Sequence, residues 1–273
     1  MAEIYTLKPT ELEYFEMQHY MSDSAERYVA RRYPPHIHDC VEFYVLLEGD
    51  VSFMVEENLY RMTAGDVLVS KPNEMHNCIL NTDSVHKHLC FWFTPPTHPV
   101  LTPFTQSGFG ENNLISLPEQ QKEELLTLCR ILHRAAEEKD RLKEIYSALH
   151  FLHLLQSGIK NNSPCIHRQT LPETLQNVLS DINKRFTQIR SLTYFTEKYF
   201  ISQSTLQRLF KKYLHTTPKL YIETKKLAFS RMLLKQGYSV FDACMQAGFS
   251  DYSNYVQLFK RRFGITPKRY RDE

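Results

Sequence analysis

The chain has 273 residues, enough for about two domains, and its composition, 42% hydrophobic and 23% charged, is typical of a folded water-soluble protein. No apolar run approaches the roughly 18 residues of a membrane-spanning helix, and the acidic N-terminus lacks the basic and apolar regions of a signal peptide. The six cysteines are scattered without a CxxC pair, so we expect reduced thiols and a cytoplasmic location.

The net charge of +2 conceals a division of the chain into an acidic and a basic part. Residues 171–273 contain 18 Lys and Arg against 8 Asp and Glu, a net of +10, whereas residues 1–170 carry a net of −8. Such asymmetry predicts that the basic part meets a polyanion. Charge alone is equally compatible with a solvated basic surface.

Residues 1–113 are expected to form a β-domain. Between residues 27 and 93, short segments rich in Val, Phe, Tyr and Leu alternate with Gly, Asp, Pro and Asn. Several short strands at this spacing predict an antiparallel sandwich or a small β-barrel. Residues 94–113 are rich in Pro, Thr, Gly and Asn and are expected to form a loop.

Residues 114–158 have the periodicity of two amphipathic helices. Leucines recur at helical spacing in the first, and the second repeats the pattern and reaches Gly158. Such a helical hairpin can present a stripe to a second copy of the chain or pack on its own β-domain, and both can hold. Residues 159–170 are polar and without periodicity, so we place an interdomain linker there.

The basic part contains an internal repeat. Residues 209–221 read LFKKYLHTTPKLY, and residues 258–270, 49 positions later, read LFKRRFGITPKRY. A tandem copy predicts a duplicated structural unit. Each copy has a helix, a tight turn and a second helix, over about residues 188–214 and 238–263, and a long helix joins them. This geometry places a second helix in the DNA major groove.

Sequence details indicate where these helices begin and end. Ser191 is expected to cap the first unit's leading helix, Ser202 its second helix, and Ser250 or Asp251 the second helix of the other unit. Gly248 lies where the turn needs a positive φ angle.

Residues 171–273 resemble the DNA-binding domain of the AraC/XylS family of bacterial transcription regulators, and AGFSDYSNYVQLFKRRFGITPKRYR closely matches the family signature. The resemblance implies a sequence-specific regulator of transcription rather than an enzyme. Its partners would be double-stranded DNA, a small-molecule effector, a second copy of the chain, and RNA polymerase if it is an activator. The first unit departs from the family pattern at Phe195, His215 and Lys226.

The resemblance also implies that the exposed face of each second helix contacts bases. Arg reads guanine, whereas Gln and Asn read adenine. The corresponding positions are Ser204, Gln207 and Arg208 in the first unit and Tyr252, Ser253, Asn254 and Gln257 in the second. We assign to phosphate contact, which positions the protein without specifying sequence, Lys211, Lys212, Lys260, Arg261 and Arg262.

The N-terminal part resembles the small cupin barrel often found ahead of this DNA-binding domain. One cupin motif is matched by the stretch from His36 to Gly49, and the other by Gly65-Asp66, Pro72 and His76. In metal-binding cupins, two histidines, a glutamate and a later histidine coordinate one ion. The resemblance therefore implies a divalent ion such as Zn, Fe, Mn or Ni at His36, His38, Glu42 and His76.

The same positions are open to other interpretations. They can line the pocket of an organic effector without a metal, by analogy a carbohydrate, with Tyr44 and Trp92 as further walls. A metal-dependent cupin enzyme with a DNA-binding domain, or a direct metal sensor, is the alternative function. His86, His88 and Cys90 share one strand face and are a weaker zinc candidate. The expected fold class is α+β: a cupin-like β-barrel with a helical hairpin, then an all-α domain of two helix-turn-helix units.

Overall fold

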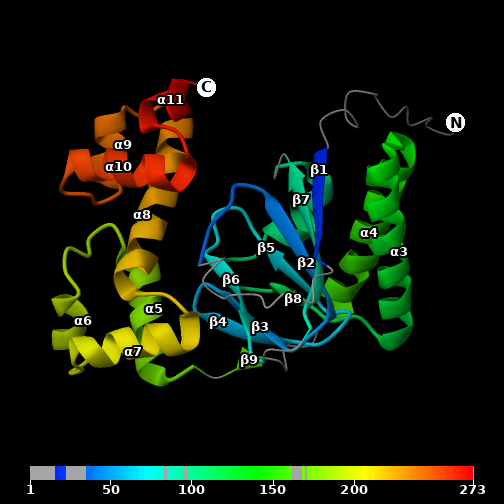
Figure 1. Ribbon diagram of the computed structural model, residues 1–273, viewed down its shortest axis with the longest axis horizontal. Coiled ribbons are helices and arrows are strands. Elements are labelled where there is room, and N and C mark those ends of the chain that lie inside the picture. Colours follow the sequence, from blue (N-terminus) through cyan, green and yellow to red (C-terminus); the bar gives the residue numbers. More distant parts are fainter. Residues whose placement is uncertain are drawn as a thin grey trace, which may run out of the picture.

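A computed structural model shows an N-terminal part of two β-sheets and two long helices, followed by a helical C-terminal part (Figure 1). Among the residues that the structure describes, no helix is both long and apolar enough to span a bilayer. The described residues are 16–22, 35–82, 85–94, 97–161, 168–169 and 171–272.

The strands form two antiparallel sheets, of orders β1-β7-β2-β5-β8 and β6-β3-β4-β9. The two sheets face each other as an open, cupin-like barrel, which agrees with the antiparallel β-domain expected from the sequence. The strands are β1 (Glu16–Ser22), β2 (Val41–Glu48), β3 (Val51–Val55), β4 (Asn58–Met62), β5 (Val67–Ser70), β6 (His76–Leu80), β7 (Lys87–Thr94), β8 (Leu114–Ile115) and β9 (Arg168–Gln169).

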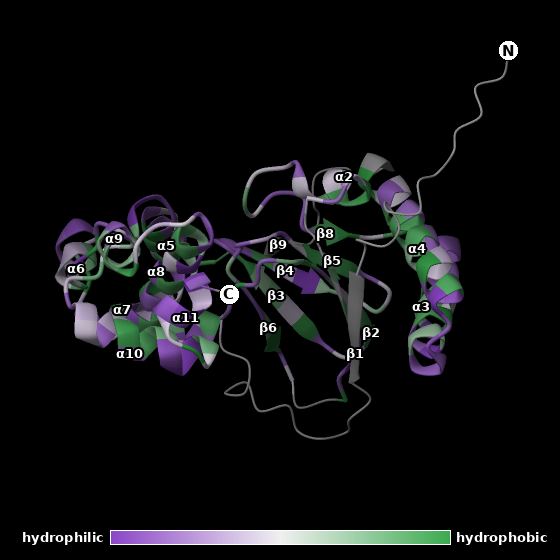
Figure 2. Ribbon diagram, turned by 90° about the horizontal axis from the view of Figure 1, so that it is seen from above, coloured by the Kyte–Doolittle hydropathy of each residue, from purple (hydrophilic) through white to green (hydrophobic). Residues whose placement is uncertain are grey.

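Both sheets are buried on both faces. In β2, Val41 and Phe43 belong to the apolar cluster that includes the helices, whereas Tyr44 and Leu46 belong to the cluster between the sheets. The burial pattern of β2 is therefore nearly continuous, because each face of the strand has an apolar neighbour. Figure 2 shows the resulting layers: long helices, one sheet, the other sheet, and the C-terminal helices.

The two long helices are α3 (Glu119–Glu138) and α4 (Arg141–Asn161), and they cover the outer face of the five-stranded sheet. A short 3₁₀ turn, Pro99–Leu101, and the single-turn helix α2 (Thr102–Thr105) precede them. The structure differs from the expected linker at 159–170. Helix α4 continues to Asn161, and β9 pairs with β4, so part of that segment is regular structure.

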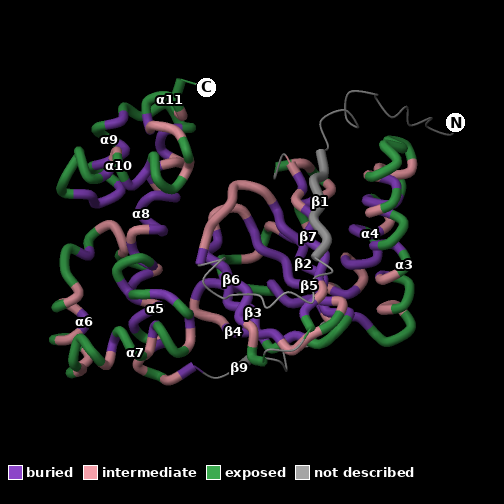
Figure 3. The backbone as a smooth tube through the Cα atoms, in the orientation of Figure 1, coloured by how far each residue is buried: buried purple, intermediate pink, exposed green. Residues whose placement is uncertain are grey.

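The C-terminal part contains the two expected helix-turn-helix units. The first consists of α6 and α7, the second of α9 and α10, and α8 connects them as a largely buried helix (Figure 3). Helix α5 precedes the first unit and was not identified from the sequence. The helices are α5 (Glu173–Arg185), α6 (Thr193–Lys198), α7 (Gln203–Leu214), α8 (Pro218–Lys235), α9 (Val240–Gln246), α10 (Tyr252–Phe263) and α11 (Pro267–Asp272).

Side-chain caps fix where the helices that follow each turn begin. Ser202 accepts a hydrogen bond from the Thr205 N–H at the start of α7, and Asp251 accepts one from the Asn254 N–H at the start of α10. The prediction for Ser191 was wrong, because Leu192 is the N-cap residue of α6. The Ser191 hydroxyl accepts a hydrogen bond from the Thr193 N–H instead.

Gly248 has the positive φ angle expected for it, +84°. Its backbone also lies against Thr187 in the segment after α5, so that a Cβ atom added here would be 2.0 Å from the Thr187 carbonyl oxygen. The second unit's turn therefore requires glycine both for its conformation and for space.

Replacing Gly248 with alanine is expected to lower the free energy of unfolding by about 3 kcal/mol or more, because backbone strain and steric overlap add. Gly237→Ala is the matched control: φ is +87°, but no atom lies within 4 Å of an added Cβ. It should cost only about 1 kcal/mol. Urea unfolding of both variants measures the difference, and equal losses would contradict the close approach to Thr187.

Candidate functional site

Helix α7 presents a polar face to solvent. The predicted base-contact residues Ser204, Gln207 and Arg208 are all exposed, and so is Lys211 one turn further on. The opposite side of the helix buries Leu206, Phe210 and Leu214. Helical spacing places the four polar residues on one side, as direct readout from a recognition helix requires.

Helix α10 repeats this arrangement in the second unit. Tyr255 and Phe259 are fully buried against the unit's core. The side chains predicted to contact bases are exposed at its start and along one side, namely Tyr252, Ser253, Asn254 and Gln257. Lys260 and Arg261, predicted to contact phosphates, are exposed in the last turn.

Arg262 lies elsewhere. Nine residues separate it from Ser253, which at 100° per residue places the two on opposite sides of α10. Arg262 lines a groove of about 190 Å³ together with Pro35, and burial and the nearby Arg231 lower its guanidinium pKa. Arg262 is exposed like Arg261, which lines the same groove, so phosphate contact by Arg262 stays a prediction.

Helices α7 and α10 lie on the same side of α8 (Figure 2). The two units are tied together by Lys226 of α8, whose Nζ donates to the carbonyl oxygens of Ile189 and Gly248, each at 2.9 Å. Lys226, which departs from the family's usual arginine, thus fixes the second unit's turn against the segment before the first unit.

The four predicted metal ligands come together in the β-domain. One ligand atom from each lies within 4.8 Å of the others, and they form what we call the histidine cluster: His36, His38, Glu42 and His76. Glu42 Oε2 is 2.5 Å from His38 Nε2 and 3.3 Å from His76 Nε2. His36 and His76 also pair through their backbones, with N–H to O distances of 3.0 Å in both directions.

The cluster is electrostatically coupled. Burial would raise the pKa of Glu42, but hydrogen bonds and charge from His38 and His76 outweigh it and hold the pKa well below its usual range. For His76, burial would lower the pKa, but contact with Glu42 outweighs it and raises the pKa. The cluster therefore favours a bound positive charge, either a proton or a metal ion.

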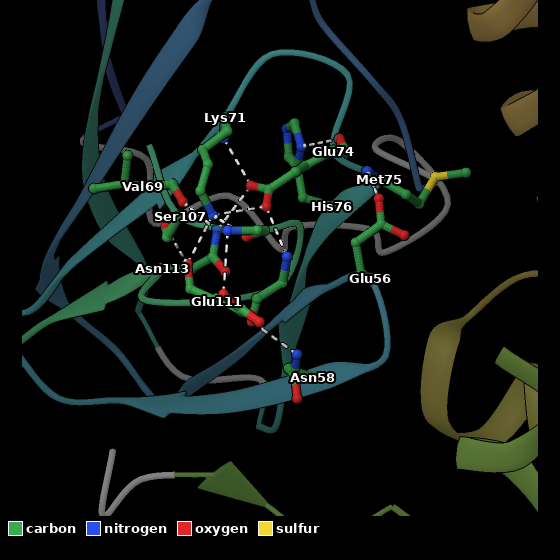
Figure 4. Close-up of polar contacts among 12 residues, drawn as sticks. Glu56, Asn58, Val69, Lys71, Glu74, Met75, His76, Ser107, Glu111 and Asn113 are labelled. Carbon is green, nitrogen blue, oxygen red and sulfur yellow. Dashed lines mark hydrogen bonds and ion pairs between the residues drawn. The ribbon is translucent and has the colours of Figure 1, made fainter. Parts of the chain in front are cut away.

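His76 is held in place by a buried polar network (Figure 4). Its Nδ1 is 3.0 Å from the Glu74 carbonyl oxygen, so that donation from Nδ1 leaves Nε2 directed at the cluster. The Glu74 carboxylate accepts from the Lys71 N–H and Nζ, the Gly110 N–H and Asn113 Nδ2, at 2.7–2.9 Å. This arrangement is the outer-shell support that metal-binding histidines usually have.

Tyr44 and Trp92, predicted to wall an effector pocket, lie on the same side of the sheet as the cluster. The Trp92 ring is 6.4 Å from that of His38, and the Tyr44 ring is 4.7 Å from that of His88. Burial lowers the pKa of His88 to about 3 and that of His86 to about 4, so both rings are neutral. Among the described residues, the alternative group of His86, His88 and Cys90 does not assemble as a metal site.

The two halves of the chain match two family models. Residues 24–155 match an AraC-like ligand binding domain, and residues 195–273 match a helix-turn-helix domain. The chain belongs to the AraC/XylS family. This AraC-type protein is a DNA-binding transcription regulator with an N-terminal ligand-binding domain, and its relatives are regulators rather than enzymes. The enzyme alternative is therefore not retained.

Two relatives known from their sequences agree with this assignment. The regulator is 27% identical over 235 residues to the HTH-type transcriptional regulator YbfI of Bacillus subtilis, covering 83% of this chain and 82% of that one. It is 21% identical over 254 residues to the HTH-type transcriptional activator RhaS of Salmonella, covering 88% and 87%. Among solved structures, ToxT from Vibrio cholerae aligns over 95% of this chain and 97% of that one, with 13% identity and a TM-score of 0.38.

Replacing Arg208 with alanine is expected to weaken binding to a site selected from random duplexes by about 5- to 150-fold, because a bidentate base contact contributes roughly 1–3 kcal/mol. The preference at one base position should relax. Lys211→Ala should instead weaken binding to all duplexes alike. It should also reduce the slope of the logarithm of the binding constant against the logarithm of the salt concentration by about one. Fluorescence anisotropy at several salt concentrations separates the two.

Arg185→Ala is the control, since Arg185 is exposed on α5 outside both units. Unchanged affinity in the Arg208 variant, or an equal loss in the Arg185 variant, would contradict the assigned recognition face.

Proposed function

We propose that this AraC-family regulator adjusts transcription in response to a small molecule bound at the histidine cluster, where His36, His38, Glu42 and His76 hold a divalent ion. The observation that carries the proposal is the convergence of these four ligand atoms within 4.8 Å of one another, with Glu42 and His76 buried and His36 and His38 half-buried. As a regulator of transcription it would act in the cytoplasm, beside the chromosome, and would contact RNA polymerase if it activates.

The donor set fits a first-row divalent ion. Imidazole and carboxylate suit Zn, Fe, Mn and Ni alike. With metal–ligand distances near 2 Å, ligand atoms on opposite sides of an ion stand about 4 Å apart, close to the spacing within the cluster. The positive charge that the cluster favours, and the outer-shell hydrogen bond from His76 to Glu74, support the same conclusion.

An ion here would serve binding. Bound metal supplies a Lewis-acidic centre that accepts an oxygen or nitrogen atom of a ligand. The half-buried Trp92 ring beside the cluster offers an aromatic face to the remainder of that ligand, whereas Tyr44, buried and stacked on His88, lies behind that surface. An oxygen-rich effector such as a carbohydrate suits this combination. A thermal-shift screen of candidate ligands, with and without chelator, identifies the effector, because a bound ligand stabilises the folded protein by mass action.

Protein purified without chelator is expected to carry about one divalent ion per chain, measured by plasma mass spectrometry. His76→Ala should lose the ion or weaken its binding by more than about 100-fold, since it removes a ligand as well as its outer shell. His88→Ala is the matched control, because it also truncates a buried imidazole of the β-domain but lies outside the cluster.

Calorimetric titration of chelated protein with Zn²⁺, Ni²⁺ and Mn²⁺ gives the affinities. If neither the purified nor the titrated wild-type protein binds an ion, the metal part of the proposal is wrong, and the cluster is a polar pocket wall. If chelator alone changes DNA affinity without any organic ligand, the ion itself is the effector.

We further propose that α4 supplies a homodimer contact. Its outer side carries the exposed residues Leu142, Tyr146, Leu149 and His153, spaced so that they form one stripe along the helix. Leu142 is 81% exposed and Tyr146 68% exposed, which is unusual for apolar side chains on a helix whose other side is buried. A second copy that presents the same stripe would cover it with two-fold symmetry.

Tyr146→Glu is expected to weaken self-association at least tenfold, because it places a charge at the centre of the stripe. Gln120→Glu, an exposed position near the other end of the hairpin, adds the same charge without touching the stripe. Light scattering across a concentration series measures the dissociation constants. A wild-type protein that stays monomeric at high micromolar concentration would contradict the proposal.

A further inference from the structure

A short segment of residues 35–40, which we call the strap, lies between the histidine cluster and the DNA-binding helices. His36 of the strap pairs with the backbone of His76, and the His38 carbonyl accepts from the Asn73 N–H at 2.8 Å. The strap is thus extended and fixed to the strand that carries the fourth ligand. In an extended segment, alternate side chains point to opposite sides.

That alternation divides the strap between two structures. His36 and His38 belong to the histidine cluster. Ile37 packs against the apolar cluster that joins the four-stranded sheet to the first helix-turn-helix unit, and it lines a cavity of about 460 Å³ at the domain junction. Asp39 forms an ion pair with Lys235 at the end of α8. The strap's two cluster ligands therefore alternate with two residues that hold the DNA-binding domain.

A second connection begins at the fourth ligand. Met75, next to His76, exchanges hydrogen bonds of 2.8 Å with Glu56: the Met75 N–H donates to the Glu56 carboxylate, and the Glu56 N–H donates to the Met75 carbonyl oxygen. The other carboxylate oxygen of Glu56 forms an ion pair with Lys225 of α8. Both charged side chains are almost completely buried, at 2% and 8% exposure.

The two connections end on the same helix. Lys225 and Lys235 are both on α8, ten residues apart, and Lys226 beside Lys225 holds the second unit's turn. The histidine cluster is thus linked to helix α8 by two routes, one through the strap and one through the turn at Glu56. Helix α8 in turn sets the relative position of the two recognition helices. The seven predicted base-contact residues are exposed in this packed arrangement, so packing constrains their placement without covering them.

We propose that the strap and the Glu56–Lys225 pair couple ion binding at the histidine cluster to the packing of the DNA-binding domain against the β-domain. This inference rests on the proposed function of the cluster. In the packed arrangement the four ligand atoms are already assembled, so an ion that selects the assembled cluster also selects the packed arrangement. Linkage is reciprocal, so the contacts that hold the DNA-binding domain against the β-domain must raise the affinity of the cluster for the ion.

The test measures ion affinity in variants remote from the cluster. Lys225→Met together with Lys235→Ala removes both ion pairs from the α8 side and alters no ligand. In the full-length chain, titration with Zn²⁺ or Ni²⁺ should give a dissociation constant about 5- to 50-fold higher than in wild type, within the usual range of coupling. Lys268→Ala, exposed on α11, removes one positive charge of the same domain and should leave the constant unchanged.

Small-angle X-ray scattering supplies a readout other than affinity. The ion should make the wild-type chain more compact, whereas the double variant should stay expanded at the same ion concentration. If the buried Lys225 change prevents folding, Lys235→Ala alone, at a pair about half exposed, should still raise the constant measurably. Equal constants in wild type and folded variants would overturn the coupling while leaving the ion site intact. No ion binding in wild type would overturn both.

Discussion

The two sheets of the β-domain carry apolar side chains on both of their faces, and covering the two outer faces is the constraint on which the architecture depends. Helices α3 and α4 cover the five-stranded sheet. The four-stranded sheet presents Met54, Leu59 and Ile79, which join one apolar cluster with the first helix-turn-helix unit. The DNA-binding domain therefore covers the outer apolar face of the four-stranded sheet. Separating the two domains would expose that face to water, at a free-energy cost proportional to its area.

Polar contacts across that junction act differently from apolar ones. Burial raises the pKa of Glu56 even though Lys225 lies against its carboxylate. Desolvation of both charges offsets much of their attraction, so such a pair contributes orientation more than net free energy. The Asp39–Lys235 pair is about half exposed and is weakened by solvent screening. Apolar packing thus favours the closed arrangement in the intact chain, and the ion pairs determine its alignment. Removing Lys225 alone has a larger effect, because the Glu56 carboxylate would then be buried without its partner, which opposes packing.

Much of this molecule could be predicted where the signal is local. The 49-residue repeat, the capping residues Ser202 and Asp251, and the ligand spacing from His36 to Glu42 depend on neighbouring residues, and the structure shows the helices and the cluster accordingly. Long-range contacts were not predictable: Lys225 and Glu56 are 169 residues apart in sequence. A lysine on an amphipathic helix is usually solvated, so nothing local marks its buried partner.

Two adjacent lysines on α8 face different structures: Lys225 contacts the β-domain, and Lys226 contacts the second unit's turn. Domains that can be exchanged freely require a junction with few specific contacts. Helix α8 does not provide such a junction. A chimera that joins this sensor to another regulator's DNA-binding domain must carry residues matching Glu56, Asp39 and the outer apolar face of the four-stranded sheet. For this chain, a foreign DNA-binding domain is therefore compatible only if its connecting helix carries partners for these same residues.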